Sequence, residues 1–417
     1  MKKSLLAVAA IGAFASAAQA QSSVTVYGIL DMGYIGGNSR VSTNAVQTNG
    51  GQVKSTANAF SNSAESTSRL GFKGTEDLGG GMSAFFTAEF QLYPQDGDLS
   101  GNSNGGLLNR QTFVGLKKNG IGSTALGTQY TPTFNTVTAT SASGANNIIG
   151  DLVYAGGSPI QSTKEFNNAG AQTVSMTNRV SNALTLQSDS FAGFRANALW
   201  TLANTNTSAI ANSSGQITSG GNSNASGWGL GADYTYNKFF VSVGYQSLKQ
   251  LTSATNNGTT LVTGLSAVPA AWASAQPSNA SIAGSAVNIQ DNQFAAGASY
   301  DFGILKAYAQ FVNRKATATA TSNWYVKRSA EQIGVRSFIT PKIEAWAQGG
   351  LGRYTAAGAN SPTVNMNSWQ LGSNYYLSKR TNLYAIYGQQ INSTGAIGSV
   401  SGSSSASQYA LGVRHTF

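Results

Sequence analysis

The sequence has no cysteine and a single histidine, His415, among its 417 residues. Disulfide frameworks, iron–sulfur clusters and cysteine-ligated zinc are therefore excluded, and one histidine leaves almost nothing for Ser–His or metal–His catalysis. Charged residues make up only 10% of the chain, against about 25% in typical soluble domains. We predict a protein without enzymatic activity, metal or cofactor.

Long apolar runs and basic clusters are also missing. Beyond the N-terminus no stretch approaches the roughly 20 apolar residues that a membrane-spanning helix needs. The formal net charge is +10, yet there is no basic run and no basic patch interleaved with aromatic residues. Binding to nucleic acid is therefore not predicted.

The N-terminus has the pattern of a secretory signal. Two lysines after the initiator methionine precede the apolar stretch Leu5–Phe14, and Ala18–Ala20 supplies a small-residue cleavage site. The apolar stretch is too short for the alternative, a membrane anchor. We predict a cleaved signal peptide over residues 1–20 and one domain over residues 21–417.

What the chain does have is apolar and polar alternation with period two from end to end, which is typical of β-strands. One example is the apolar series Val180, Leu184 and Leu186. Such stretches span about 10 to 14 residues, long for a globular strand but suited to a tilted strand that crosses a bilayer. The opposite sides are small and polar, which fits either a barrel lumen or the wet face of a sandwich.

The connections between these stretches favour the barrel, because short and long ones alternate strictly, as in outer-membrane barrels. The seven short ones are Asp77–Gly81, Lys118–Gly122, Ser188–Gly193, Asn237–Lys238, Asp301–Gly303, Thr340–Lys342 and Ser378–Arg380. The eight long ones fall near 37–64, 94–107, 131–173, 204–225, 250–290, 316–324, 356–365 and 393–405. They join sixteen strands, so the first (23–36) can pair with the last (406–417) and leave no open edge.

Several segments resemble trimeric general porins of Gram-negative bacteria, and the beta-proteobacterial branch in particular. They are RLGFKGTEDLG from Arg69, Val24–Asp31, Arg110–Leu116, Asn178–Asn182 and Gly412–Phe417. The resemblance implies an all-β, transmembrane, 16-stranded antiparallel β-barrel that assembles as a homotrimer. It also implies that the third long loop, 131–173, folds into the barrel and constricts the pore. Thr131 and Pro132 open this loop, and Asp151 and Glu165 are its acids.

The candidate selectivity residues are basic. By resemblance, Arg69, Arg110 and Arg179 match the constriction arginines of the family, although Arg110 shares its strand face with Thr112 and Val114. By alternation phase alone, further basic side chains point into the lumen: Lys73, Arg195, Lys306, Arg336 and Arg414. Basic groups of one sign in a water-filled channel favour anions.

Two other groups of residues have open interpretations. Asp31, an acid on the lumen side, either contributes to a transverse field or anchors a neighbouring arginine. Phe417 resembles the terminal aromatic residue that the barrel-assembly machinery recognises. Aromatic residues near strand ends predict a girdle at the membrane interface: Tyr34, Phe90, Tyr93, Tyr375, Tyr384 and Phe417.

We therefore predict a channel of the bacterial outer membrane, surrounded by its lipids, through which small hydrophilic solutes diffuse passively. Its basic lumen predicts a preference for anionic over cationic solutes, with neutral ones also admitted. A channel specific for organic acids or sugars is the alternative, although no aromatic track is visible. A β-rich adhesin and an enzyme built on a barrel are further alternatives, disfavoured by the turn pattern and by the position of His415.

Overall fold

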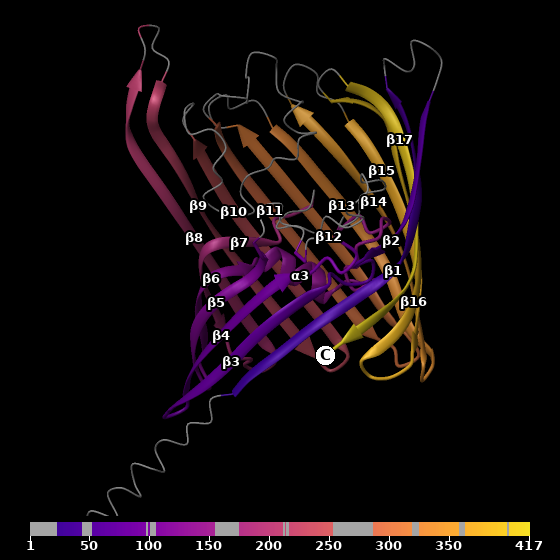
Figure 1. Ribbon diagram of the computed structural model, residues 1–417, viewed down its shortest axis with the longest axis horizontal. Helices are drawn as coiled ribbons and strands as arrows, with labels where there is room; N and C mark the ends of the chain where they lie inside the picture. Colours follow the sequence, from indigo (N-terminus) through magenta and orange to yellow (C-terminus); the bar gives the residue numbers. More distant parts are fainter. Residues whose placement is uncertain are drawn as a thin grey trace, which may run out of the picture.

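The computed structural model describes residues 23–43, 52–96, 99–100, 106–154, 175–211, 213, 217–252, 287–318, 325–357, 363–397 and 400–417. The predicted signal peptide and Glu165 lie outside these ranges. Within them the chain forms β-strands and one short helix (Figure 1). The elements are β1 (Ser23–Thr43), β2 (Val53–Asn62), β3 (Arg69–Gly79), β4 (Met82–Gln91), β5 (Leu108–Lys118), β6 (Gly122–Tyr130), α3 (Pro132–Ala139), β7 (Arg179–Ser188), β8 (Phe194–Ala211), β9 (Ile217–Tyr236), β10 (Phe239–Thr252), β11 (Val287–Asp301), β12 (Lys306–Ala318), β13 (Tyr325–Thr340), β14 (Ile343–Ala357), β15 (Thr363–Tyr376), β16 (Thr381–Ile397) and β17 (Val400–Thr416).

The strands close into an antiparallel barrel (Figure 1). The first and last strands pair from Ile29 opposite Thr416 to Thr43 opposite Gly402. Both β2 and β3 pair with β1, at its C-terminal and N-terminal halves respectively. They therefore share one position in the wall, interrupted at residues 63–68, and the seventeen described strands occupy sixteen positions. The pairing of the first strand with the last closes the wall, so the sheet does not end in two open edges; among the described strands, β2 pairs only with β1.

All seven predicted short turns join consecutive strands, but the strands at the other end run further than predicted. Strand β1 continues to Thr43, and β9 begins at Ile217, inside the predicted loop 204–225. These extensions are rich in Ser, Thr, Asn and Gly and show no apolar alternation. Ladder hydrogen bonds need only a neighbouring strand, so strands that project into water require no apolar face.

The outer face of the wall is apolar and the inner face is polar. On β13, Ile333 is 72% exposed whereas its neighbour Gln332 is 4% exposed, and Leu351 on β14 is 60% exposed. Alternation of this kind fits a wall between lipid and an interior lined with polar groups. Among the described residues, no helix is long and apolar enough to cross a membrane.

The sequence expectation for the face of Val180 is wrong. Val180 does not share the outer face with Leu186, because it is fully buried beside Leu199 and Leu248. The β6–β7 register shifts between Gly127 and Gln129, and Asn182 has φ of 52°, so an irregularity reverses the phase of β7.

The predicted aromatic girdle also loses two members. Tyr384 and Tyr93 are only 3% and 5% exposed and so lie away from the outer surface. The Tyr384 hydroxyl donates to the Asp31 carboxylate over 2.6 Å. Gly412 on the neighbouring strand leaves room for this ring, since a Cβ atom there would overlap the hydroxyl.

Candidate functional site: a charged cluster and an inward-folded loop

The structure brings the three predicted constriction arginines together on alternate strands of one part of the wall, β3, β5 and β7. Arg69 on β3 and Arg110 on β5 both face Glu89 on β4, with Nη1 of Arg69 at 3.8 Å and Nε of Arg110 at 2.8 Å from its Oε1 atom. Arg110 also donates to the Tyr130 hydroxyl over 3.0 Å. The guanidinium of Arg179 lies over the Tyr130 ring, 6.0 Å from its centre.

A β-bulge explains how Arg110 reaches the interior despite its strand phase. The β4–β5 register passes from Glu89 opposite Gln111 to Phe90 opposite Asn109, which leaves Arg110 as the extra residue. Val114, in phase with it by sequence, is 61% exposed on the outer face, whereas Arg110 is 5% exposed. The extra residue rotates the strand locally and turns the guanidinium inward.

Glu89 is the functional residue that sequence reasoning missed. It is 3% exposed and also accepts a hydrogen bond from the Tyr27 hydroxyl over 3.1 Å. The available signal was that Glu89 is the sole acid of β4. One carboxylate among three guanidinium groups leaves the cluster with a net charge of +2 (three minus one).

Arg179 is the least compensated member of this cluster. It is 4% exposed, and its Nη1 atom has no hydrogen-bond partner among the described residues. The Tyr154 ring is buried in the same region, and burial raises the pKa of its hydroxyl to about 12, so it stays neutral. Arg110 and Arg179 are buried, whereas the Arg69 side chain keeps 19% exposure.

The five basic residues chosen by phase alone differ in their surroundings. The ammonium groups of Lys73 and Lys306 lie over the rings of Tyr27 and Tyr308, at 5.4 and 5.2 Å. Arg195 is 2.7 Å from the Asp233 carboxylate. The arginines at 336 and 414 are likewise paired with acids.

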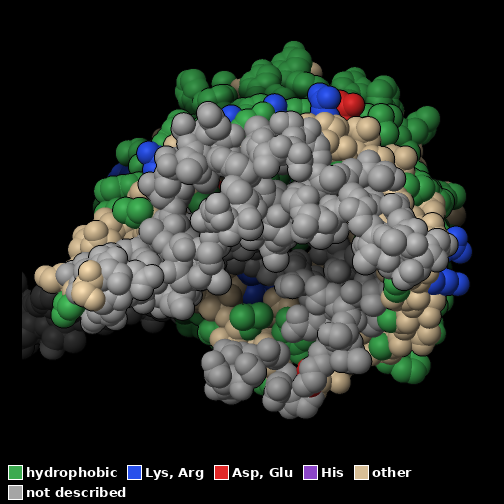
Figure 2. Space-filling view, turned by 90° about the horizontal axis from the view of Figure 1, so that it is seen from above, with side chains coloured by type: hydrophobic (Ala, Val, Ile, Leu, Met, Phe, Trp, Pro, Cys, Tyr) green, Lys and Arg blue, Asp and Glu red, His purple; other side chains and the backbone are tan. Residues whose placement is uncertain are grey.

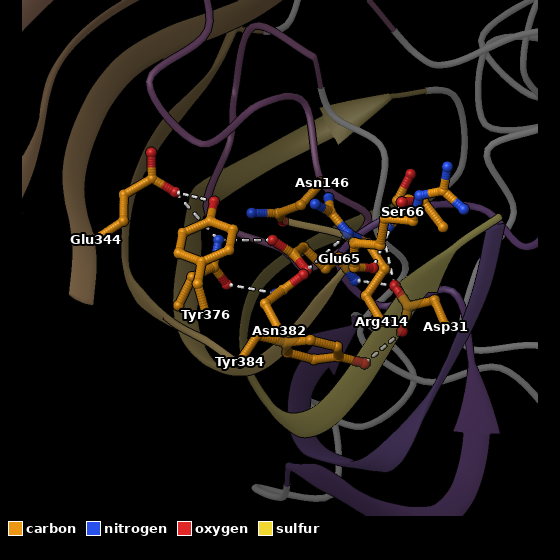
Figure 3. A network of polar contacts seen from close by, with 12 residues as sticks. Asp31, Glu65, Ser66, Asn146, Glu344, Tyr376, Asn382, Tyr384 and Arg414 are labelled. Atoms are coloured by element: carbon orange, nitrogen blue, oxygen red, sulfur yellow. Dashed lines mark hydrogen bonds and ion pairs between the residues drawn. The ribbon is translucent and has the colours of Figure 1, made fainter. Parts of the chain in front are cut away.

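These last two pairs belong to a polar network on the inner wall, of which Figure 3 shows the part around Glu65, Glu344 and Arg414. Arg414 lies 3.6 Å from Glu65, and Arg336 lies 3.4 Å from Glu344. Asn374 donates to both acids, over 2.8 and 3.2 Å. Each arginine in this network therefore has an acidic partner, so its charge is largely compensated.

Asp31 holds the interruption between β2 and β3. Its carboxylate is fully buried and accepts hydrogen bonds from the main-chain amides of Glu65 and Ser66, over 2.9 and 2.6 Å, and from Tyr384 (Figure 3). No ion pair between Asp31 and an arginine is found among the described residues, and the contribution of Asp31 to a transverse field stays a prediction. We assign Asp31 to holding segment 63–68 in place.

Segment 131–154 leaves the wall after β6 and lies inside the barrel, where α3 is seen at mid-height (Figure 1). Thr131 is the N-cap of the helix: its hydroxyl accepts from the Phe134 amide over 3.3 Å and donates to the Thr177 carbonyl over 2.6 Å. Pro132 occupies the first turn, where a missing amide proton has no cost. Cβ atoms on Gly229 or Gly244 would press against this proline.

Seven inward glutamines bind this segment and residue 177 through main-chain groups. Here called the glutamine belt, they are Gln246, Gln293, Gln310, Gln332, Gln348, Gln370 and Gln408, each at most 6% exposed. Each one bonds a main-chain atom. Gln246 and Gln293 bond Thr177, Gln310 bonds Val137, Gln332 bonds Leu152, Gln348 bonds Ser143, and both Gln370 and Gln408 bond Ile149. Strand β16 lacks a glutamine at this level and instead has Gly388, where a Cβ atom would overlap the Ile149 carbonyl oxygen. The belt thus crosses eight neighbouring strands, β10 to β17.

The acid of this segment is turned into the segment itself. Asp151 is 2% exposed and accepts from the amides of Val153 and Tyr154, over 3.1 and 2.8 Å, and from the Ser143 hydroxyl over 2.9 Å. Gln332 donates to it over 3.1 Å. Its contacts fold the segment and fasten it to the wall.

Comparison with known proteins supplies the family. A sequence model of the family described as Gram-negative porin matches residues 7–395. Outer membrane porin protein 32 of Delftia acidovorans is 38% identical over 160 residues, which cover 38% of this chain and 41% of that protein. Major outer membrane protein P.IB of Neisseria meningitidis serogroup A is 38% identical over 117 residues, covering 28% of this chain and 31% of that protein. These alignments therefore span less than half of either relative.

Solved structures share the fold over nearly the whole chain. An anion-selective porin from Comamonas acidovorans has a TM-score of 0.63 at 22% identity, covering 95% of this chain and 100% of that one. OmpT of Vibrio cholerae has a TM-score of 0.55 at 13% identity, covering 95% and 98%. With a family model that spans most of its length and a closed antiparallel barrel like those of solved porins, this chain belongs to the Gram-negative porin family and is a protein of the bacterial outer membrane.

Proposed function

We propose that this porin is a passive diffusion channel for small hydrophilic solutes that prefers anions. The observation that carries the proposal is the cluster of Arg69, Arg110 and Arg179 with Glu89 as its acid. A net positive charge inside a low-dielectric wall raises the local concentration of anions and lowers that of cations. The remaining predicted lumen cations, paired or placed over rings, are secondary contributors. The function is that of a channel, so no catalytic step is involved.

The same proposal makes segment 131–154 the constriction. The segment is fastened to the inner face of β10 to β17 by the glutamine belt, and the charged cluster occupies β3 to β7. Because segment 131–154 fills one side of the barrel interior, the remaining open cross-section of the pore lies between this segment and the wall of β3 to β7. Solutes would pass there, next to the arginines, so size exclusion and charge selection act at one level.

Support also comes from the solved neighbour described as an anion-selective porin. We carry its preference to this chain only as part of the proposal, since the two share 22% identity.

The test is the reversal potential of the purified protein in a planar bilayer under a KCl gradient. Salt should be kept near 0.1 M or below, where the Debye length is about 10 Å or more. We expect stepwise conductance and a potential set by chloride. A potassium-selective channel would overturn the arginine argument, and a folded protein without conductance would overturn the channel itself.

One observation favours a second candidate, a channel specific for organic acids. The rings of Tyr130 and Phe134 are stacked with centroids 4.3 Å apart, and Tyr154 lies 6.3 Å from Phe134, next to the arginine cluster. Rings beside cations could hold an aromatic carboxylate. In that case benzoate should block the chloride current with saturation, whereas a general porin should conduct both anions without saturation at millimolar concentrations.

We further propose that the chain assembles as a homotrimer after removal of residues 1–20, and that Phe417 is its signal to the barrel-assembly machinery. The terminal residue lies at the closing seam, where its amide and carbonyl pair with Gly28, both over 3.1 Å. Mass photometry in detergent tests the trimer. Deleting Phe417 should leave unassembled protein in the periplasm, and normal assembly of that variant would contradict the role.

A further inference from the structure

The outer face of β12 to β14 carries three cations at the end with the long connections. They are Lys315 on β12, Lys327 on β13 and Arg353 on β14. Lys315 lies directly opposite Lys327. Arg353 lies opposite Ser329, which is two residues after Lys327 on β13 and therefore on the same face of the strand. Lys327 and Arg353 are exposed and make no ion pair within the described part of the chain.

Two like charges placed opposite each other across a strand pair are destabilising, because their Cβ atoms are only about 5 Å apart. The ammonium group of Lys315 is turned over the Tyr325 ring at 4.2 Å. Glu331 is the one acid of this outer patch among the described residues of β12 to β14, so the patch keeps a net charge of +2 (three minus one). Such a patch is complementary to an anion.

Below the cations, the same face forms a continuous amphipathic recess. A pocket of about 250 Å³ with a mixed polar and apolar lining includes Arg353, Glu331 and Asn365. It adjoins an apolar groove of about 920 Å³, and the two share Phe311, Glu331 and Leu351 in their linings. The floor of the groove is made of small residues, including Ala298 and Ala309.

We propose that this recess is a specific binding site for a phosphorylated lipid. The phosphate group lies between Lys315, Lys327 and Arg353, and an acyl chain lies along the groove towards Ala309. Long connections face the outside of the cell in barrels of this kind, so the lipid belongs to the outer leaflet. Basic side chains stand on the outer wall among hydrophobic ones when the molecule is viewed from that end (Figure 2). Charge complementarity selects a phosphorylated lipid, because one such molecule supplies both an anion for the three cations and an acyl chain for the adjoining apolar groove.

The experiment is lipid titration of the intact protein in detergent, followed by native mass spectrometry. The probe is diphosphorylated lipid A, with its monophosphorylated form and dioleoylphosphatidylcholine alongside. We compare the wild type with K315Q/K327Q/R353Q and with the matched control K238Q/K342Q/K379Q, which removes three exposed lysines from the short-turn end. A fourth variant, Ala309→Phe, fills the groove and leaves every charge in place.

We expect the wild type and the control to retain diphosphorylated lipid equally, and the patch variant to bind it about a hundredfold more weakly, since each of the three basic residues contributes about a factor of five near a membrane surface. Ala309→Phe should also weaken binding, and phosphatidylcholine should bind weakly to all four proteins. Equal binding by the patch variant, an equal loss in the control, or displacement by millimolar inorganic phosphate would overturn the site. So would conversion of the patch variant to monomers with lipid retention unchanged, which would identify a contact between subunits. The result does not depend on ion selectivity.

Discussion

The side-chain amide of Gln370 donates a hydrogen bond to the main-chain carbonyl of Ile149 over 3.1 Å, joining two residues 221 positions apart in the sequence. The same nitrogen donates to the Ile148 carbonyl over 3.0 Å. An irregular segment has no ladder to satisfy its backbone groups, so partners must come from elsewhere. A glutamine offers both a donor and an acceptor at the end of one side chain, and the belt repeats this device strand after strand.

Replacing Gln370 with leucine should loosen the inner segment without opening the barrel. Buried carbonyls that lose their partner cost about 1–3 kcal/mol. We expect faster hydrogen exchange at the amides of residues 146–150 and a noisier single-channel current. Gln389→Leu is the control, because that side chain bonds Trp369 on the outer face. Unchanged exchange in Gln370→Leu would show that the belt does not hold the segment.

Gly388→Ala tests the contact at the one strand of the belt that lacks a glutamine. The added methyl group would overlap the carbonyl oxygen of Ile149, which must then move off the wall. We expect protease sensitivity in segment 131–154 and a changed unit conductance. At Gly349 an added Cβ would meet its nearest atom at 3.6 Å, an ordinary contact, so Gly349→Ala should behave like the wild type. Equal behaviour of the two variants would contradict the close fit.

Arg179→Gln should reduce anion preference more than the loss of any paired arginine. One charge at about 8 Å from an ion in a partly aqueous channel contributes about 0.5–1 kcal/mol. The chloride-to-potassium permeability ratio should therefore fall about two- to fivefold. Arg195→Gln is the comparison, because its guanidinium is held by Asp233 at 2.7 Å. The measurement is the reversal potential of each variant in a KCl gradient. Equal shifts in both variants would show that Arg179 contributes no more to anion preference than a paired arginine.

Glu89→Gln should act in the opposite direction. Removing the carboxylate that Arg69 and Arg110 share raises the net charge of the cluster from +2 to +3. The permeability ratio should rise, while the two guanidinium groups repel each other and the protein unfolds at a lower temperature. Glu89→Asp keeps the charge and should preserve selectivity. A reversal potential that moves towards potassium in Glu89→Gln would contradict the assignment.

The sequence predicts the barrel well because the patterns that indicate it are local in the sequence. Apolar alternation and the strict succession of short and long connections depend on neighbouring residues alone, and the seven short turns are where this pattern places them. The strand extensions were missed because residues such as 204–207 and 221–225 form ladders without an apolar face.

The site was predictable only in part, because its geometry depends on long-range contacts. Strand phase points Arg110 the wrong way, and only the bulge opposite Glu89 and Phe90 corrects it. The glutamine belt is visible in the sequence as inward polar positions, but nothing local says that they bind a segment from between β6 and β7. Asp31 likewise gains its role from residues 65 and 66, across a strand pair.

The charged cluster and the belt occupy different parts of the circumference, β3 to β7 and β10 to β17. We expect substitutions in the first set to alter which ions pass, while the glutamine contacts of the inner segment remain intact. If the proposed roles hold, the ion preference of the channel and the attachment of its inner segment can be altered by separate sets of substitutions.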